Sequence, residues 1–213
     1  DLGDNSEDNL WSLGELTNLR DLHFTYSRLP SSEHLKRNLI ALASSLGKLC
    51  NLKSVTLAPG TAGMVVLVDG SSSMSSAPVF LERLELLPPI CIFSRLPKWI
   101  GQLRKICIVK VAVKELLTND IDILTGLPSL AVLSLWDQTA PEGGIIFNEG
   151  ALPVLKYFEF RCGVLCLAFM AGAMPNLRRI KLAFNTDIRE KYSNMLPGIE
   201  HLLNLQDVTG QIG

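Results

Sequence analysis

The chain has 213 residues, of which 47% are hydrophobic and only 7% aromatic, so aliphatic side chains must dominate its core. Its formal net charge of −1 argues against a general nucleic-acid-binding protein. No apolar run approaches the roughly 20 residues that a membrane-spanning helix requires, and we expect neither a membrane span nor a signal peptide.

One apolar pattern, L-x-x-L-x-x-L-x-L with other apolar residues replacing some leucines, recurs from one end of the chain to the other. Its apolar positions are Leu16/Leu19/Leu22/Phe24, Leu49/Leu52/Val55/Leu57, Pro78/Leu81/Leu84/Leu86, Ile100/Leu103/Ile106/Ile108, Leu127/Leu130/Leu133/Leu135, Leu152/Leu155/Phe158/Phe160, Met174/Leu177/Ile180/Leu182 and, more weakly, Leu202/Leu205/Val208. The copies recur every 20 to 30 residues or so, and their central L-x-x-L-x-L is the leucine-rich-repeat signature.

The spacing within each copy predicts a strand, because two apolar positions separated by one residue place two side chains on the same face. A single copy cannot bury that face, but stacked copies can. We therefore predict an α/β fold: one leucine-rich-repeat domain over residues 1–213, with about eight irregular repeats. It should be a curved solenoid with a parallel β-sheet on its concave face and irregular loops and short helices on its convex face.

Two segments between the copies have helical character. In Ser32–Leu46, leucines at 35, 39, 42 and 46 follow helical spacing, and Ser32 is suited to the N-cap. The segment 119–124 predicts one short helical turn. Both should lie on the convex face.

Residues 61–78 predict a flexible insertion between the second and third strands, because the part from Gly70 to Ala77 is small and polar. Asp69, Ser71 and Ser73 match the D-x-S-x-S that opens a metal-ion-dependent adhesion site, whose oxygens suit Mg²⁺. Such a site also needs residues from other loops of a doubly wound sheet. Since repeat copies flank the segment on both sides, we expect no metal there.

No phosphate-binding loop, dinucleotide fingerprint or nucleophile elbow occurs, so we expect no enzyme activity. The five cysteines are an odd number, none lies near either end, and no N-x-S/T triplet is present. These features favour free thiols in a cytoplasmic protein. Cys162 and Cys166 alone are too few ligands for a metal site.

The residues between the apolar positions carry a family resemblance. Ser12–Leu22 (SLGELTNLRDL) returns as Ser45–Val55 (SLGKLCNLKSV), Leu96–Leu103 reads LPKWIGQL, and P-[NS]-L occurs at Pro128–Leu130 and Pro175–Leu177. From about Leu10 to Val208, the chain resembles the C-terminal leucine-rich-repeat domain of a plant coiled-coil nucleotide-binding immune receptor, of the type found in cereals. We accordingly expect it to be a piece of a longer protein.

The resemblance implies a module that senses a pathogen effector or a modified host protein and restrains the nucleotide-binding switch. ATP or ADP would bind to the nucleotide-binding domain, which these residues do not include, so no cofactor is expected here. The asparagine that regular repeats place after each strand occurs only as Asn185, so no continuous ladder of that kind is expected. The alternative is the substrate-recognition arm of an F-box leucine-rich-repeat ubiquitin-ligase adaptor.

Residues that alternate with the apolar positions should face the concave side, where a protein partner would bind. The predicted protein-binding residues are Arg83, Glu85, Leu87, Lys105, Val109, Trp136, Tyr157, Glu159, Arg161, Arg179 and Lys181. Five cations facing two carboxylates, around a Trp and a Tyr, favour a partner with an acidic face or an intramolecular contact with the nucleotide-binding domain. Neither a nucleic acid nor a membrane span is expected.

Overall fold

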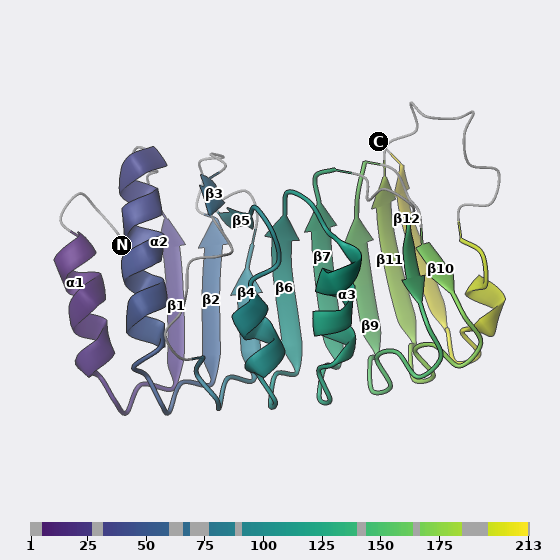
Figure 1. The fold of residues 1–213 in the computed structure, drawn as a ribbon, viewed down its shortest axis with the longest axis horizontal. Helices are drawn as coiled ribbons and strands as arrows, with labels where there is room; N and C mark the ends of the chain where they lie inside the picture. Colours follow the sequence, from purple (N-terminus) through teal and green to yellow (C-terminus); the bar gives the residue numbers. More distant parts are fainter. Residues whose placement is uncertain are drawn as a thin grey trace.

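A row of eight parallel strands in sequence order forms the main part of a ten-stranded sheet in the computed structural model (Figure 1). The structure describes residues 6–26, 32–59, 66–68, 77–87, 91–139, 144–163, 167–184 and 196–212. The strands are β1 (Asp21–Tyr26), β2 (Ser54–Pro59), β4 (Arg83–Leu86), β6 (Ile108–Val113), β7 (Val132–Asp137), β9 (Tyr157–Arg161), β11 (Arg179–Phe184) and β12 (Asp207–Ile212). The predicted α/β repeat solenoid is thereby confirmed.

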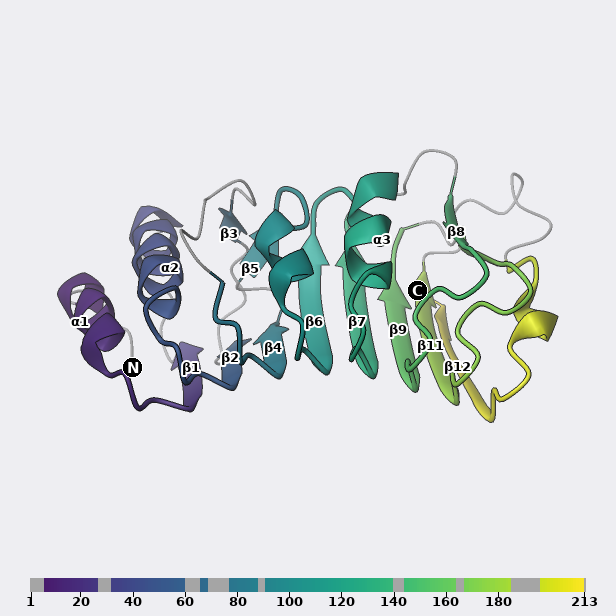
Figure 2. The same ribbon diagram turned by 60° about the horizontal axis from the view of Figure 1, so that its bottom comes forward.

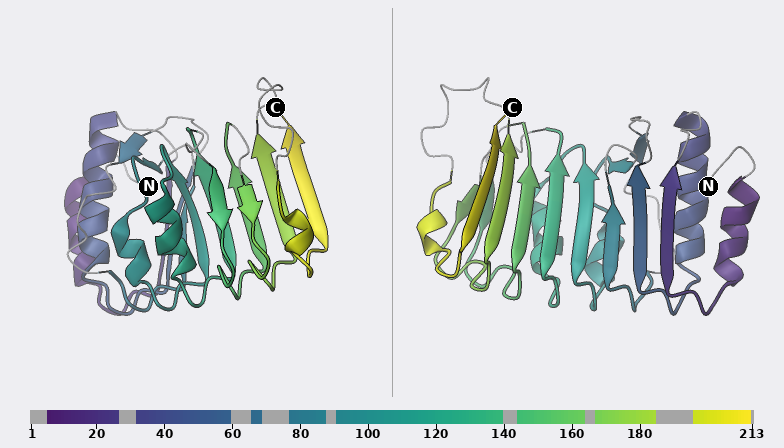
Figure 3. Two further views of the ribbon diagram at one scale, coloured as in Figure 1. Left: turned by 45° about the vertical axis from the view of Figure 1, so that its right-hand side comes forward. Right: turned by 180° about the vertical axis from the view of Figure 1, so that it is seen from behind.

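A second layer covers one face of this sheet (Figures 1 and 2). Its elements are α1 (Ser6–Ser12), α2 (Ser32–Leu46), β3 (Val66–Val68), β5 (Cys91–Phe93), α3 (Thr118–Thr125), β8 (Ile145–Phe147), β10 (Leu167–Phe169) and the 3-10 helices Leu13–Glu15, Lys98–Gln102 and Ile199–His201. No helix of the described ranges lies on the opposite face (Figure 3). We call this helix-free side of the sheet the concave face and the covered side the convex face.

The core lies between the two layers, because each strand of the main sheet sends alternate side chains toward the convex elements. In β7, Leu133 and Leu135 are 0% and 1% exposed. Phe147 of β8 packs edge-on against Phe158 of β9 at 5.6 Å between ring centroids, and it stacks on Phe169 of β10 at 5.7 Å. These contacts fix the second layer to the sheet.

Both predicted helical segments are confirmed on the convex face. The helix α2 spans the predicted residues, and Leu39, Leu42 and Leu46 are buried. At the start of α3, a carboxylate oxygen of Asp120 accepts the backbone N–H of Leu117 at 3.0 Å and lies 3.3 Å from Nε of Arg95.

The alignment of the fourth copy was wrong by three residues. Arg83 pairs with Ile108 and Glu85 with Lys110, so Val109 and Val111, both 0% exposed, face the core. The apolar frame is therefore Leu103/Ile106/Val109/Val111 rather than Ile100/Leu103/Ile106/Ile108. Both frames satisfy the same spacing, and only strand pairing distinguishes them.

Two apolar positions predicted to be buried are exposed: Leu16 is 51% and Val208 56% exposed. Leu16 precedes β1, and Val208 lies on β12, and these two strands are the edges of the described sheet. A position of this kind is buried only when repeats stack on both of its sides.

The predicted insertion is partly built into the fold. Within it, β3 pairs in parallel with β5, and Ala77 and Pro78 are buried. Residues 60–65 and 69–76, which include Asp69, Ser71 and Ser73, lie outside the described part of the chain. Among the described residues, Cys50, Cys91, Cys107 and Cys162 form no disulfide, and burial raises the pKa of Cys91 to about 12.

The turns that precede the strands are tied together by side-chain amides and hydroxyls. Each donates to a carbonyl of the preceding repeat: Asn51 to Thr17 at 2.9 Å, Ser129 to Arg104 at 3.2 Å, Asn176 to Pro153 at 2.7 Å and Asn204 to Pro175 at 2.7 Å. We call this row the turn ladder. The turn ladder gives hydrogen-bond donors to backbone carbonyls just before the strands begin. The asparagine ladder of regular repeats instead follows each strand.

Candidate protein-binding surface

Strand pairing orders the concave face into three rows of side chains that cross the sheet. The first row is Asp21, Ser54, Arg83, Ile108, Val132, Tyr157, Arg179 and Asp207; the second is His23, Thr56, Glu85, Lys110, Ser134, Glu159, Lys181 and Thr209; the third includes Thr25, Ala58, Ala112, Trp136, Arg161, Ala183 and Gln211. Neighbouring members of a row lie on adjacent strands, about 4.8 Å apart, except that the third row has no member on β4 between Ala58 and Ala112.

Glu159, which is 8% exposed, organises the centre of this face. One carboxylate oxygen lies 3.1 Å from Nη2 of Arg161 and 3.2 Å from Nζ of Lys181. The other accepts hydrogen bonds from Oγ of Ser134 at 3.2 Å and from the Tyr157 hydroxyl at 3.3 Å. A single buried carboxylate thus holds four side chains from β7, β9 and β11 in place.

The pKa values of this cluster follow from its contacts. Burial alone would raise the pKa of Glu159, but the hydrogen bonds and positive charges of Lys181 and Arg161 outweigh it and lower the pKa overall. Burial and the neighbouring Glu159 carboxylate raise the pKa of the Tyr157 hydroxyl. Glu159 is therefore ionised and Tyr157 neutral at physiological pH.

A second cluster surrounds Glu85 on β4. Nη1 of Arg83 lies 2.9 Å from one of its carboxylate oxygens, and Nζ of Lys110 on β6 lies 3.3 Å from the other. Lys110 was missed by the sequence prediction because the fourth copy was read in the wrong frame. The alternation V-K-V-A-V over 109–113 was the available signal, since it is typical of a strand with Lys110 on the outer face.

Both aromatic residues of the predicted surface lie on the concave face beneath a cation. The Arg161 guanidinium lies 5.8 Å from the ring centre of Trp136, and that of Arg179 lies 5.9 Å from the ring centre of Tyr157. Both aromatic side chains are half-buried. Such stacks leave an arginine edge and part of a ring available to a partner.

Three predicted residues are not placed as expected. Val109 is buried in the core. Lys105 precedes β6 and contacts Phe80 instead, with its Nζ 4.3 Å from the ring centre. Leu87 follows β4, and its backbone N–H donates to Leu57, but the structure gives it no partner on β6.

With Lys110 in place of Lys105, the count of five cations and two carboxylates is retained. We call Arg83, Glu85, Lys110, Trp136, Tyr157, Glu159, Arg161, Arg179 and Lys181 the central patch. It is a positively charged surface with two aromatic rings, held rigid by shared carboxylates on a hydrogen-bonded sheet. No group of three or more His, Cys, Asp or Glu side chains among the described residues could hold a metal ion.

Asp137 follows Trp136 on β7 and points to the opposite, buried side. Its Oδ1 accepts the Thr139 backbone N–H at 3.2 Å, while its buried Oδ2 has no hydrogen-bond partner among the described residues. Burial raises the pKa of Asp137 to about 7, despite backbone hydrogen bonds that act in the other direction. This carboxyl group, on the buried side of β7, therefore titrates near neutrality.

Comparisons with known proteins agree with this architecture. A family model described as a leucine-rich repeat region matches residues 2–213. Over its whole length of 213 residues the chain is 66% identical to the disease resistance protein RGA5 of Oryza sativa subsp. japonica, and it spans 19% of that relative. The predicted resemblance to the leucine-rich-repeat part of a plant disease resistance protein is thereby confirmed. No helix in the described ranges is long and apolar enough to cross a membrane.

Proposed function

The chain belongs to the leucine-rich repeat family whose model it matches, and from this premise we propose that it is a recognition and autoinhibitory module of an intracellular plant immune receptor. Its similarity to a disease resistance protein supports this role over that of a ubiquitin-ligase adaptor. Because the chain spans only 19% of that relative, nucleotide binding would belong to other parts of the parent protein. We propose that the module works in the cytoplasm.

The composition of the central patch supports this proposal most strongly. It presents three more positive than negative charges, and its two aromatic rings are held under arginines. Arginine, tryptophan and tyrosine are the residues that dominate binding energy at protein interfaces. We infer a protein partner with an acidic face.

We propose two partners for the patch, and both belong to one mechanism. At rest, the patch contacts the nucleotide-binding switch of the same receptor. When an effector or a modified host protein competes for the patch, the switch is released. Such competition requires a rigid surface, because a surface that reorders would lose affinity for both partners.

The test is the double substitution Trp136→Ala and Arg161→Ala in the full-length parent receptor. It removes one cation–aromatic stack but leaves Lys181 to pair with Glu159. We expect near-normal protein levels together with either lost response to the effector or effector-independent signalling. The matched control is Thr25→Ala with Ala58→Ser, on β1 and β2 of the same concave face. Wild-type signalling by the double variant would exclude the patch as the recognition surface.

A further inference from the structure

The strands of the convex layer share a short sequence pattern. Three of them, β5, β8 and β10, read apolar-x-Phe, and their Phe93, Phe147 and Phe169 side chains are 7%, 1% and 2% exposed. In parallel, β3 pairs with β5 and β8 pairs with β10, and Phe93 of β5 also pairs with Val113 at the end of β6. Between these pairs, the chain after β6 forms α3 instead of a strand (Figure 2). We call the successive strands of the convex layer the convex ladder and each strand of it a rung. In the repeat that contains β6, a helix replaces the rung.

This replacement leaves one edge of β8 without a strand. The Phe147 carbonyl accepts the Met170 backbone N–H at 2.9 Å, so the backbone groups of Phe147 point toward β10. Because these groups alternate in direction along a strand, the N–H and C=O of Ile146 point to the other edge, toward α3. In the described part of the chain, β8 pairs only with β10.

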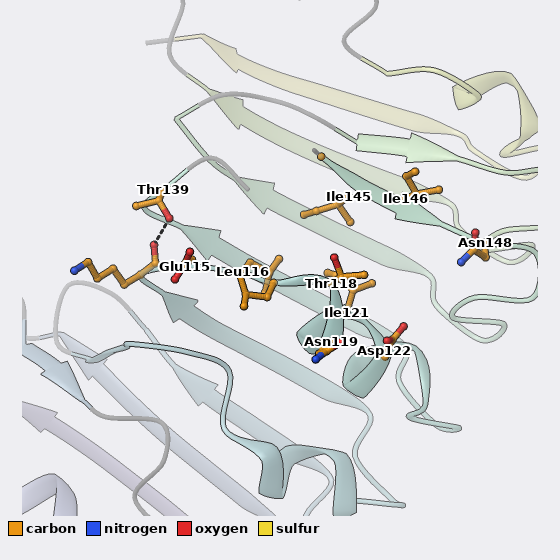
Figure 4. Close-up of a pocket in the computed structure, with 13 residues that line it drawn as sticks. Glu115, Leu116, Thr118, Asn119, Ile121, Asp122, Thr139, Ile145, Ile146 and Asn148 are labelled. Atoms are coloured by element: carbon orange, nitrogen blue, oxygen red, sulfur yellow. Dashed lines mark hydrogen bonds between the residues drawn. The ribbon is translucent and has the colours of Figure 1, made fainter. Parts of the chain in front are cut away.

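The open edge borders a pocket with a volume of about 910 Å³ between α3 and β8 (Figure 4). Its apolar wall includes Leu116, Ile121 and Ile145, which are 1%, 6% and 4% exposed. Ile146 and Leu117, which also line it, are 53% and 37% exposed. The pocket thus combines an apolar interior with a backbone edge that can still form hydrogen bonds.

Among the described residues, the lining of the pocket carries one more negative than positive charge. The pocket is lined by Glu115 and Asp122 as acids and by Lys114 as the one base. All three are exposed, and none of them has an ion pair among those observed within the described ranges. A ligand with a positive charge at its outer side would therefore be favoured over one with a negative charge.

We propose that this groove binds an extended peptide of apolar-basic-aromatic sequence, which adds to the free edge of β8 as the missing rung of the convex ladder. The peptide backbone pairs with the N–H and C=O of Ile146, as in other cases of strand addition. Its apolar and aromatic side chains enter the pocket, following the pattern of β5, β8 and β10. Its basic side chain meets Glu115 or Asp122.

The probe is a fluorophore-labelled peptide, acetyl-Ser-Thr-Ile-Lys-Phe-Thr-Ser-amide, titrated with the 213-residue chain and followed by fluorescence anisotropy. Saturable binding is expected. Two further peptides carry backbone N-methyl groups, one at Lys and the other at Ile and Phe. Because alternate N–H groups of a strand face one edge, one of the two should lose binding by about tenfold or more. If neither does, strand addition is wrong.

The matched protein variants are Ile146→Pro and Ile146→Val. Proline removes the N–H that faces the groove and leaves the bonds to β10 intact, since edge strands accept proline where the N–H points outward. We expect the proline variant to lose peptide binding about tenfold at an unchanged circular dichroism spectrum, and the valine variant to retain it. Should the proline variant unfold, the N-methylated peptides still decide the question with the wild-type chain.

Charge and self-association complete the test. The double variant Glu115→Gln with Asp122→Asn should weaken binding of the lysine peptide by about threefold but leave a peptide with threonine in place of lysine unaffected. Equal effects on both peptides would remove the basic residue from the proposal. Dimerisation of the chain that Ile146→Pro abolishes would assign the edge to a second copy and overturn the peptide proposal.

Discussion

Replacing Asp137 with asparagine tests the electrostatics beneath the central patch. Burial raises the pKa of Asp137 from 3.8 to about 7, and Glu115 and Asp120 add repulsion. At pH values between 3.8 and about 7, Asp137 is protonated in the folded chain and ionised in the unfolded chain. The slope of unfolding free energy with pH is therefore negative, and stability falls as pH rises from about 4 to about 7.

The slope has an upper limit of about 1.4 kcal/mol per pH unit, which gives on the order of 4 kcal/mol over the window. In the Asp137→Asn variant this contribution is absent, while the Thr139 N–H keeps its acceptor. Urea unfolding of both proteins, followed by circular dichroism at several pH values from 4 to 8, measures the difference. That difference should shift in favour of the variant as pH rises. A difference that is constant over this range would refute the buried, neutral carboxyl group.

The remaining predictions concern packing, the Glu159 cluster and the turn ladder. Leu133→Ala, at a fully buried site, should lower the free energy of unfolding by about 2–5 kcal/mol, whereas Leu16→Ala, at an exposed one, should cost less than about 1 kcal/mol in the same urea assay. The pKa of Glu159 is lowered in the folded chain, so wild type should have a higher free energy of unfolding than Glu159→Gln at pH values above the unfolded pKa of a glutamate. This difference should disappear as pH falls through the pKa of the folded chain. A difference that grows in acid would contradict the ion pairs. Asn176→Ala should cost about 0.5–1.5 kcal/mol, and Asn18→Ala, for which the structure shows no such bond, should cost less; thermal unfolding of the two variants compares them.

The fold could be predicted because strand periodicity and repeat spacing point to the same architecture. A side chain such as Leu133 is apolar, recurs at the repeat period and is 0% exposed, so each level of the pattern agrees with the others. The helix α2 was equally accessible, since its leucines follow a helical spacing that no strand would produce.

The central patch could be predicted only in part, because a single misread copy displaces every side chain on one strand. Eight of its nine members were identified from strands whose frame is unique. The fourth copy allowed two frames three residues apart, and so Lys105 and Val109 were chosen where Lys110 should have been. A slip of three residues exchanges the two faces of a strand, just as a slip of one does.

Other features of the structure have little sequence signal. Asn176 and Asn204 bond to the preceding repeat, but Val154 and Phe80 occupy the equivalent places elsewhere, so no repeat-wide motif marks the turn ladder. Similarly, strands of three residues such as β8 are too short to show periodicity. They are formed by pairing with a neighbouring repeat rather than by local preference.

Photo-crosslinking in the full-length parent receptor tests most directly whether the central patch is the recognition surface. A benzoylphenylalanine replaces Trp136 at the centre of the patch, and in a second protein it replaces Asn119, which is exposed on the convex helix α3. Mass spectrometry then identifies the crosslinked peptides with and without effector. We predict crosslinks from position 136 to the nucleotide-binding domain at rest, and we expect these crosslinks to be reduced or replaced when effector is present. Crosslinks from position 119 alone, in both conditions, would contradict this prediction.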